Sequence, residues 1–196
     1  MAFLTELDVI NDMLATLGES PLNAIEDDHP MVAAGVRFLK VASWREQAKG
    51  WWFNKEVVTL SPDDDGYILT PADAISVDPL KPENLFVQRG RRLYNTENSS
   101  YKFTQEVKCA VTRSIPFEDL PPSAASYIAQ CAVMEFQISY DADGQKTRLI
   151  ERNVREALAA LNTEHIRNQQ VNLLYRPSVQ YEMARMGFFN RNYSRT

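Results

Sequence analysis

The segment Lys49-Gly50-Trp51-Trp52-Phe53-Asn54 divides two kinds of sequence pattern. Before it, Met31 to Lys49 places apolar residues on adjacent helical rows, and Gly50 is expected to end that helix. After it, β-branched and aromatic runs alternate with turn residues as far as about Pro122. We therefore expect a helix before this segment and a β-rich region after it.

Helical patterns also occur at both ends of the chain. Thr5 and Asp8 resemble a capping box, and the apolar residues that follow repeat at helical spacing up to Gly18. Pro122 is expected to open a third helix with so few charges that it should be buried, and His165 lies on the apolar row of a fourth. Helices from the two ends of the sequence should therefore pack together.

The intervening β region predicts six short strands, over residues 53–60, 67–70, 84–88, 92–94, 101–103 and 107–113. Its many prolines favour short edge strands. The expected fold class is α+β, a four-helix bundle with a β-rich insertion between helices two and three and an extended C-terminal arm. We expect residues 1–50 and 121–170 to form the bundle, 51–120 the insertion and 171–196 the arm.

Length and charge exclude several classes of protein. A chain of 196 residues is too short for a large multidomain enzyme. Its apolar runs are far shorter than the roughly 20 residues that cross a bilayer, and the N-terminus shows no secretion signal, so we expect a soluble protein with no membrane partner. The net charge of −5 argues against a general nucleic-acid coat, because phosphate binding depends on lysine and arginine.

The charge is unevenly distributed along the chain. Residues 171–196 hold four arginines against one glutamate, a net charge of +3, so the first 170 residues carry −8. The same arm holds five aromatic residues, and arginine and aromatic side chains are enriched at protein interfaces. The arm therefore suggests docking on a partner protein. An extension that folds back on its own domain and an arm that binds single-stranded nucleic acid are the alternatives.

The sequence offers few candidates for catalysis. Cys109 and Cys131 lie in no metal-type spacing and are expected to be buried thiols. His29 and His165 fit no zinc motif and are expected to cap or pack, and Asp63-Asp64-Asp65-Gly66 is expected to form a turn. No phosphate-binding glycine motif occurs. We expect no catalytic residue, no cofactor and no metal.

One enzyme hypothesis stays open. Glycosidases use two carboxylates and often stack sugars on aromatic rings, which the acids Glu26, Asp27 and Asp28 could supply beside Trp51 and Trp52. The alternative interpretation, helix capping together with aromatic residues in the core or an interface, is favoured.

Three stretches resemble the tail tubular protein A family, the adaptor proteins of short-tailed double-stranded DNA bacteriophages. The first is Ile10-Asn11-Asp12-Met13-Leu14-Ala15-Thr16-Leu17-Gly18-Glu19-Ser20-Pro21-Leu22, continuing to Ala24-Ile25-Glu26. The second is Lys49-Gly50-Trp51-Trp52-Phe53-Asn54, where the family has a basic residue, Gly-Trp, any residue, then Phe-Asn. The third is Phe86-Val87-Gln88-Arg89-Gly90 leading to Leu93-Tyr94, which is similar to the family's Arg-Gly hairpin. The resemblance spans about residues 4 to 170.

The resemblance implies a structural virion protein rather than an enzyme. Such adaptors form a twelve-fold ring that joins the phage portal protein to the tail nozzle, tail tubular protein B, and helps to hold the tail fibres. The genomic DNA passes through the central channel without specific binding. The implied location is the virion tail at the portal vertex, after assembly in the host cytoplasm. A virion-associated glycan-degrading enzyme and an accessory DNA-binding protein are the alternatives.

The resemblance implies a role for one set of residues, and the local sequence pattern predicts a role for a second. Family adaptors dock on the portal through the C-terminal segment, so the expected portal-docking residues are Tyr175, Arg176, Tyr181, Arg185, Phe188, Phe189, Arg191 and Tyr193. The residues between the second helix and the β region are expected to be a structural anchor that ends the helix and fixes the insertion to the bundle: Gly50, Trp51, Trp52 and Phe53.

Overall fold

The computed structural model describes residues 4–25, 29–80 and 85–174, and these residues mix helices with strands. The α+β class expected from the sequence is therefore confirmed. The elements in chain order are α1 (Glu6–Leu17), α2 (Val32–Gln47), β1 (Lys55–Leu60), β2 (Ala74–Pro79), β3 (Phe86–Arg89), β4 (Arg92–Asn95), β5 (Val107–Arg113), a 3-10 turn (Phe117–Asp119), α3 (Pro122–Tyr140) and α4 (Gly144–Leu174).

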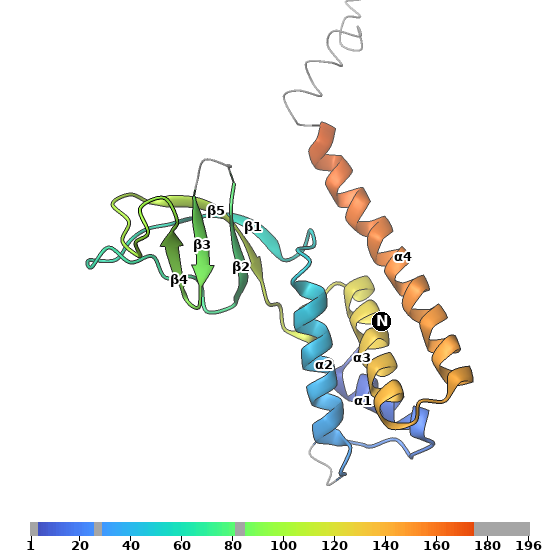
Figure 1. The fold of residues 1–196 in the computed structure, drawn as a ribbon. Helices are drawn as coiled ribbons and strands as arrows, with labels where there is room; N and C mark the ends of the chain where they lie inside the picture. Colours follow the sequence, from blue (N-terminus) through green and yellow to red (C-terminus); the bar gives the residue numbers. More distant parts are fainter. Residues whose placement is uncertain (1–3, 26–28, 81–84, 175–196) are drawn as a thin grey trace, which may run out of the picture.

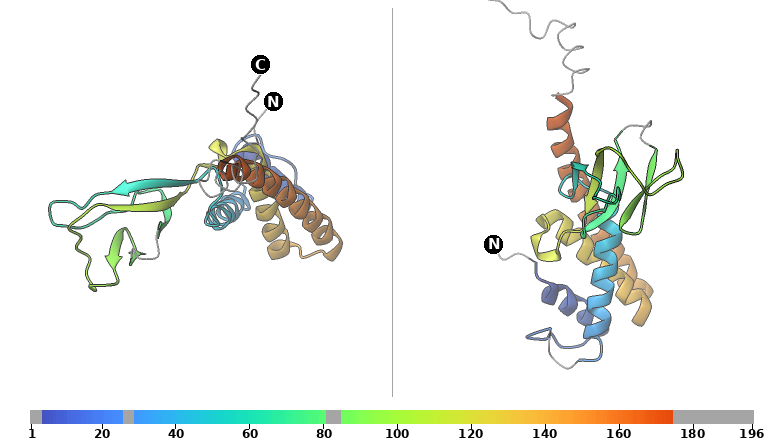
Figure 2. Two further views of the ribbon diagram at one scale, coloured as in Figure 1. Left: turned by 90° about the horizontal axis from the view of Figure 1, so that it is seen from above. Right: turned by 90° about the vertical axis from the view of Figure 1, so that its left-hand side faces the viewer.

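The two kinds of structure lie in separate parts of the molecule. We call α1 to α4 the helical unit and residues 55–113 the β unit. The β unit projects to one side from the end of α2, and a second view at right angles shows the same projection (Figures 1 and 2). None of the helices in the described ranges combines the length and the apolar character that a membrane span requires.

The helix ends follow from local hydrogen bonds. Thr5 Oγ1 accepts the N–H of Asp8, and Asp8 Oδ2 accepts the N–H of Thr5 at 2.9 Å, which confirms the predicted capping box. Gly18, at φ +78°, ends α1 in the left-handed conformation that glycine adopts without strain. Before α2, the N–H of Met31 donates to Nδ1 of His29 at 3.2 Å, but no side chain of the described residues caps the N–H groups of α2 itself.

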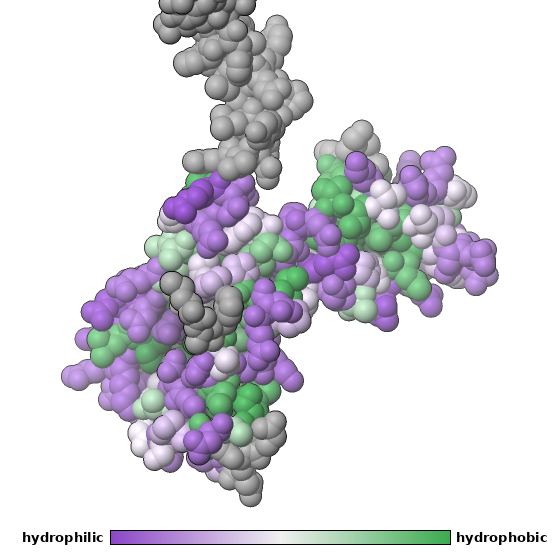
Figure 3. Space-filling model, turned by 180° about the vertical axis from the view of Figure 1, so that it is seen from behind, coloured by the Kyte–Doolittle hydropathy of each residue, from purple (hydrophilic) through white to green (hydrophobic). Residues whose placement is uncertain are grey.

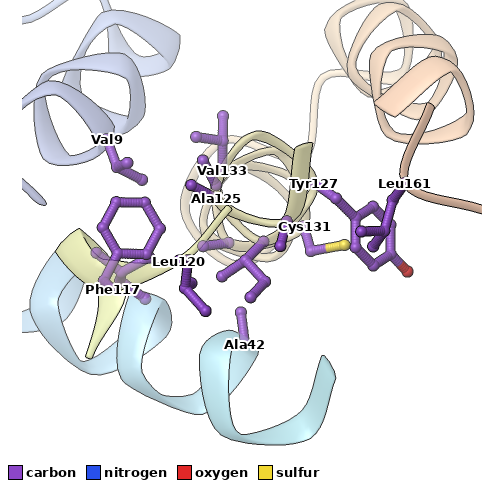
Figure 4. Close-up of a cluster of buried hydrophobic side chains, with 14 of the residues drawn as sticks. Val9, Ala42, Phe117, Leu120, Ala125, Tyr127, Cys131, Val133 and Leu161 are labelled. Carbon is purple, nitrogen blue, oxygen red and sulfur yellow. The ribbon is translucent and has the colours of Figure 1, made fainter. Parts of the chain in front are cut away.

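The helix α3 lies at the centre of the helical unit, because it contacts α1, α2 and α4. Ten of its residues are buried, as its low charge predicts, although Ile138 is exposed. The close-up shows side chains of α3 meeting side chains of the surrounding helices (Figure 4). Its labelled residues include Ala125, Tyr127, Cys131 and Val133 of α3, Val9 of α1, Ala42 of α2 and Leu161 of α4.

The β unit has a core of its own. Strand β5 pairs antiparallel with β1 on one side and β2 on the other, giving the order β1-β5-β2, and β3 pairs with β4 in a hairpin. The buried side chains form a cluster separate from that of the helical unit. They are Ile68, Val77, Phe86, Leu93, Cys109 and Val111.

The strand predictions were partly wrong. Strand β2 (Ala74–Pro79) was not predicted, because Asp78 and Pro79 gave that stretch the composition of a turn, whereas an edge strand accepts proline. Residues 67–70 and 101–103 form only isolated bridges, Tyr67 with Lys102 and Leu69 with Arg92, rather than the strands expected there. The other predicted strands correspond to β1, β3, β4 and β5.

Candidate functional site

The chain turns from the helical unit into the β unit at Gly50 and Trp51. Gly50 has φ +73°, and a Cβ at this position would lie 3.4 Å from Oγ1 of Thr112. The Trp51 side chain is buried, and its Nε1–H donates to the carbonyl oxygen of Glu46 at 2.8 Å. Substitution of Gly50 would therefore strain the backbone at the point where β5 packs against the turn.

Two buried amides hold this junction together. Asn54 accepts the N–H of Trp51 at 2.8 Å and donates to the carbonyl oxygens of Gln47 and Arg113 at 3.0 and 2.9 Å. Gln47 accepts the N–H of Ile115 at 2.7 Å and donates to the Ile115 carbonyl oxygen and to Oγ of Ser43, each at 2.9 Å. Both side chains thus join the end of α2 to the strand end that leads back toward α3.

A cluster of charges lies beside the junction. The buried carboxylate of Glu46 pairs with Arg45 at 2.8 Å and with Lys49, and Arg45 also pairs with Glu135 of α3. Burial acts to raise the pKa of Glu46, but the hydrogen bonds from Lys49 and Arg45 outweigh it and hold this pKa below its ordinary value. Burial also raises the pKa of Tyr127, whose hydroxyl lies 3.4 Å from Nζ of Lys49. The cluster therefore favours a charged Glu46 and a neutral Tyr127.

A cleft opens next to the junction, between the β unit and the C-terminal part of α4. It has a volume of about 660 Å³ and is lined by Gly50, Trp51, Trp52, Lys55, Glu56, Val57, Leu80, Ala110, His165, Asn168 and Gln169. The space-filling view shows the molecule hollowed between these two parts (Figure 3). The ring of His165 lies 5.3 Å from that of Trp51 and 5.9 Å from that of Trp52, so this histidine packs, as expected.

The β3–β4 hairpin carries a basic and aromatic face. The Arg89 guanidinium lies 3.6 Å from the ring centroid of Tyr94, and that of Arg92 lies 5.0 Å from the centroid of Tyr67. Tyr94 also makes an edge contact with Tyr101 at 4.9 Å. The hairpin turns at Gly90, at φ +61°, which agrees with the Arg-Gly hairpin expected from the sequence.

The structure describes one of the two predicted sets of site residues, the anchor, but not the portal-docking set. All four anchor residues lie at the junction, with Trp51 buried and the rings of Trp52 and Phe53 half-buried and 5.1 Å apart. Their role as the anchor of the β unit stays a prediction. The eight expected portal-docking residues lie outside the described residues, as do the acids Glu26, Asp27 and Asp28. The expected docking surface therefore has no structural description.

The other residues considered for catalysis or metal binding lie in turns or in the buried core. Oδ1 of Asp63 accepts the N–H groups of Asp65 and Tyr67, which makes the turn expected there. Burial raises the pKa of Cys131 to about 11, and both cysteines are free and buried. Within residues 4–25, 29–80 and 85–174, no three His, Cys, Asp or Glu side chains come together in a way that could hold a metal ion.

Three features of the structure were not predicted from the sequence. The buried amides of Gln47 and Asn54 lie beside residues already singled out, but their polar character gave no signal of burial. Trp44 is exposed on the outer face of α2. Helical spacing from the buried Leu39 and Ala42 was a signal that could have predicted this position. The contact between the Arg89 guanidinium and the Tyr94 ring depends on the hairpin register, which pairs Arg89 with Arg92 and could have been derived from the turn at Gly90.

Comparison with known proteins identifies the family. A family model described as Tail tubular protein matches residues 7–171. The chain is similar to Tail tubular protein A of Klebsiella phage KP34, with 28% identity over 170 residues, which covers 85% of this chain and 90% of the relative. The match includes the helical unit, the junction and the β unit described above. The chain therefore belongs to the tail tubular protein family.

Proposed function

We propose that this protein is a noncatalytic adaptor that forms a ring between the portal protein of a bacteriophage and its tail nozzle. Membership of the tail tubular protein family is the observation that carries the proposal. The similarity to the tail tubular protein A of a Klebsiella phage adds support, because it covers nearly the whole of that relative. The proposed location is the tail of the virion, at the portal vertex.

The architecture suits an assembly component. The helical unit packs α1, α2 and α4 around α3, and the projecting β unit offers additional surface to neighbours (Figure 1). In the proposed ring of twelve, each copy contacts two others, while different surfaces meet the portal, the nozzle protein and the tail fibres.

Charge suits a channel through which DNA moves. With a net charge of −5 on each chain, twelve copies carry a formal charge of −60. Carboxylates that face the lumen would repel the phosphate backbone rather than hold it. Genomic DNA would therefore pass through the ring without specific binding.

The C-terminal arm is the proposed portal-docking segment. It begins after α4, which continues past residue 170 to Leu174. Its arginine and aromatic residues are of the types that make the largest contributions at protein interfaces, and we assign them to the portal contact. They are Tyr175, Arg176, Tyr181, Arg185, Phe188, Phe189, Arg191 and Tyr193.

Co-sedimentation with the purified cognate portal ring tests the proposal. We expect the full-length chain to sediment with the portal in a fixed ratio and a chain ending at Leu174 to stay in the supernatant. A full-length chain with residues 175–196 in scrambled order is the matched control, because it keeps the length and charge of the arm. Binding of the truncated chain would contradict docking by the arm, and failure of the full-length chain to bind would contradict the adaptor function.

A further inference from the structure

The β3–β4 hairpin places two arginines directly opposite each other. Arg89 and Arg92 are cross-strand partners, and Arg91 lies in the turn between them. All three side chains are exposed. Like charges that face each other across two strands destabilise the pairing, so the stability of the hairpin does not account for this arrangement. The three arginines are therefore candidates for a role in binding.

Among the described residues, no carboxylate forms an ion pair with any of these three arginines. Residues 85–96 contain no acid at all. Other acids of the β unit are placed differently: Asp73 pairs with Arg113, Glu97 lies in the turn at the far end of β4, and residues 63–65 form a separate turn. The guanidinium groups of the hairpin therefore present their charge to solvent.

Tyrosine rings hold two of these guanidinium groups in place. The guanidinium of Arg89 lies 3.6 Å from the ring centroid of Tyr94, and that of Arg92 lies 5.0 Å from the centroid of Tyr67. A guanidinium that stacks on a ring keeps its N–H edge free to donate two hydrogen bonds to one anionic group. Because the side chains are ordered before binding, less conformational entropy is lost in the contact. The hairpin therefore presents two preorganised groups that bind anions.

Apolar side chains share the sheet face of these arginines. Leu69 pairs with Arg92, and Val87 pairs with Tyr94, and residues that pair across antiparallel strands lie on the same face. Leu69 is 53% exposed and Val87 is 42% exposed. The strands β3 and β4 lie apart from the four helices (Figures 1 and 2). We give the name hairpin face to Leu69, Val87, Arg89, Arg92 and Tyr94, together with Arg91 in the turn.

The composition of the hairpin face favours a protein partner over a nucleic acid. Arginine and tyrosine are enriched at protein interfaces, where polar residues surround an apolar centre. A phosphate backbone offers no apolar counterpart to Leu69 and Val87. Single-stranded nucleic acid stacks its bases on free aromatic rings, whereas the rings of Tyr67 and Tyr94 already carry guanidinium groups.

We propose that the hairpin face docks a protein whose contact surface carries carboxylates beside apolar side chains. The guanidinium groups donate hydrogen bonds to the carboxylates of the partner, and Leu69 and Val87 pack against its apolar side chains. A carboxylate that lies between Arg89 and Arg92 offsets the repulsion between these two cations. The inference goes beyond the proposed adaptor function and does not depend on the formation of a ring.

Fluorescence anisotropy with labelled probes tests the proposal on the full-length chain. The main probe is a peptide in which glutamate and leucine alternate. The comparison probes are a peptide of equal length in which glutamate and glycine alternate and an oligothymidylate of the same charge. We expect the glutamate-leucine peptide to bind about tenfold more tightly than either comparison probe, because it alone supplies both carboxylates and apolar side chains. Absence of binding by this peptide would overturn the proposal, and tighter binding of the oligothymidylate would overturn it in favour of a nucleic acid.

Charge-reversal variants show whether the peptide binds at the hairpin face. We expect Arg89→Glu combined with Arg92→Glu to weaken binding of the glutamate-leucine peptide about tenfold. The matched control combines Arg148→Glu with Arg167→Glu, which make the same change of charge at exposed positions of α4 and should bind like the wild type. Residues 171–196 are unchanged in both variants. Wild-type affinity of the hairpin variant, or equal weakening in the control, would overturn the proposal.

A single substitution in the turn separates binding from stability. If the double variant melts at a lower temperature than the wild type, Arg91→Glu decides, because the Arg91 side chain lies exposed in the turn. We expect Arg91→Glu to keep the melting temperature of the wild type and to weaken binding of the peptide. Wild-type affinity in this variant would then overturn the proposal. The adaptor function would stand in either case, because co-sedimentation with the portal tests it separately.

Discussion

Replacement of Asn54 by alanine should destabilise the protein at the junction between its two units. The side chain is buried and makes three hydrogen bonds, with the N–H of Trp51 and with the carbonyl oxygens of Gln47 and Arg113. A hydrogen bond contributes about 0.5–1.5 kcal/mol net, so the loss of three should cost about 3 kcal/mol. For a chain of this size, that corresponds to a fall in melting temperature of about 6–12 °C.

Thermal unfolding followed by circular dichroism measures this effect. The matched control is Asn168→Ala, which makes the same substitution on the exposed face of α4, where the side chain donates one hydrogen bond to Glu164. We expect the control to stay within about 0.5 kcal/mol of the wild type. Tryptophan fluorescence should report the same transition, since Trp51 and Trp52 adjoin Asn54 in the chain. A shift below about 2 °C for Asn54→Ala would refute the argument that buried amides hold the junction.

Three further predictions concern charge, thiols and glycines. The fold lowers the pKa of Glu46 from 4.5, so the charged form of Glu46 stabilises the fold above that pH. The difference in melting temperature between the wild type and Glu46→Gln should therefore be largest at neutral pH and shrink as the pH falls below 4.5. A difference that does not depend on pH would contradict this prediction. Neither Cys109 nor Cys131 should react with a thiol reagent at pH 8 before denaturation, whereas both should react in urea, and rapid reaction of the native protein would show that burial is incomplete. Gly18→Ala should lower the free energy of unfolding by about 1 kcal/mol, because Gly18 has φ +78°. Gly144→Ala should raise it by about 0.4–1 kcal/mol, because Gly144 has open space around it. Equal effects of the two substitutions in denaturant titrations would show that the backbone conformation at Gly18 is not the cause.

Local signals account for the parts of the fold that could be predicted. The capping box at Thr5 and Asp8 and the glycine at position 18 define both ends of α1 without reference to the rest of the chain. Strand β5 was predicted with its observed bounds, 107–113, from its β-branched residues and its alternation of apolar and polar side chains, although Cys109 to Thr112 are all buried. Strand β2 was missed because its stability comes from pairing with β5, which lies about thirty residues away, rather than from its own composition.

The candidate surfaces could be predicted less well than the fold. Burial of Gln47 and Asn54 depends on backbone groups of Arg113 and Ile115, which the chain brings close only after the β unit has formed. The cleft arises from the angle between the β unit and α4, and no local pattern encodes that angle. By contrast, the exposure of Trp44 follows from helical spacing alone once the buried rows of α2 are known.

Cryo-electron microscopy of the cognate portal ring saturated with the full-length protein tests the central claim most directly. We expect a closed ring of twelve copies on one face of the portal, with the helices packed around its channel and the β units projecting from them. Portal particles that carry no additional density, or copies bound singly without closing into a ring, would contradict the claim that this member of the tail tubular protein family is the adaptor between portal and nozzle.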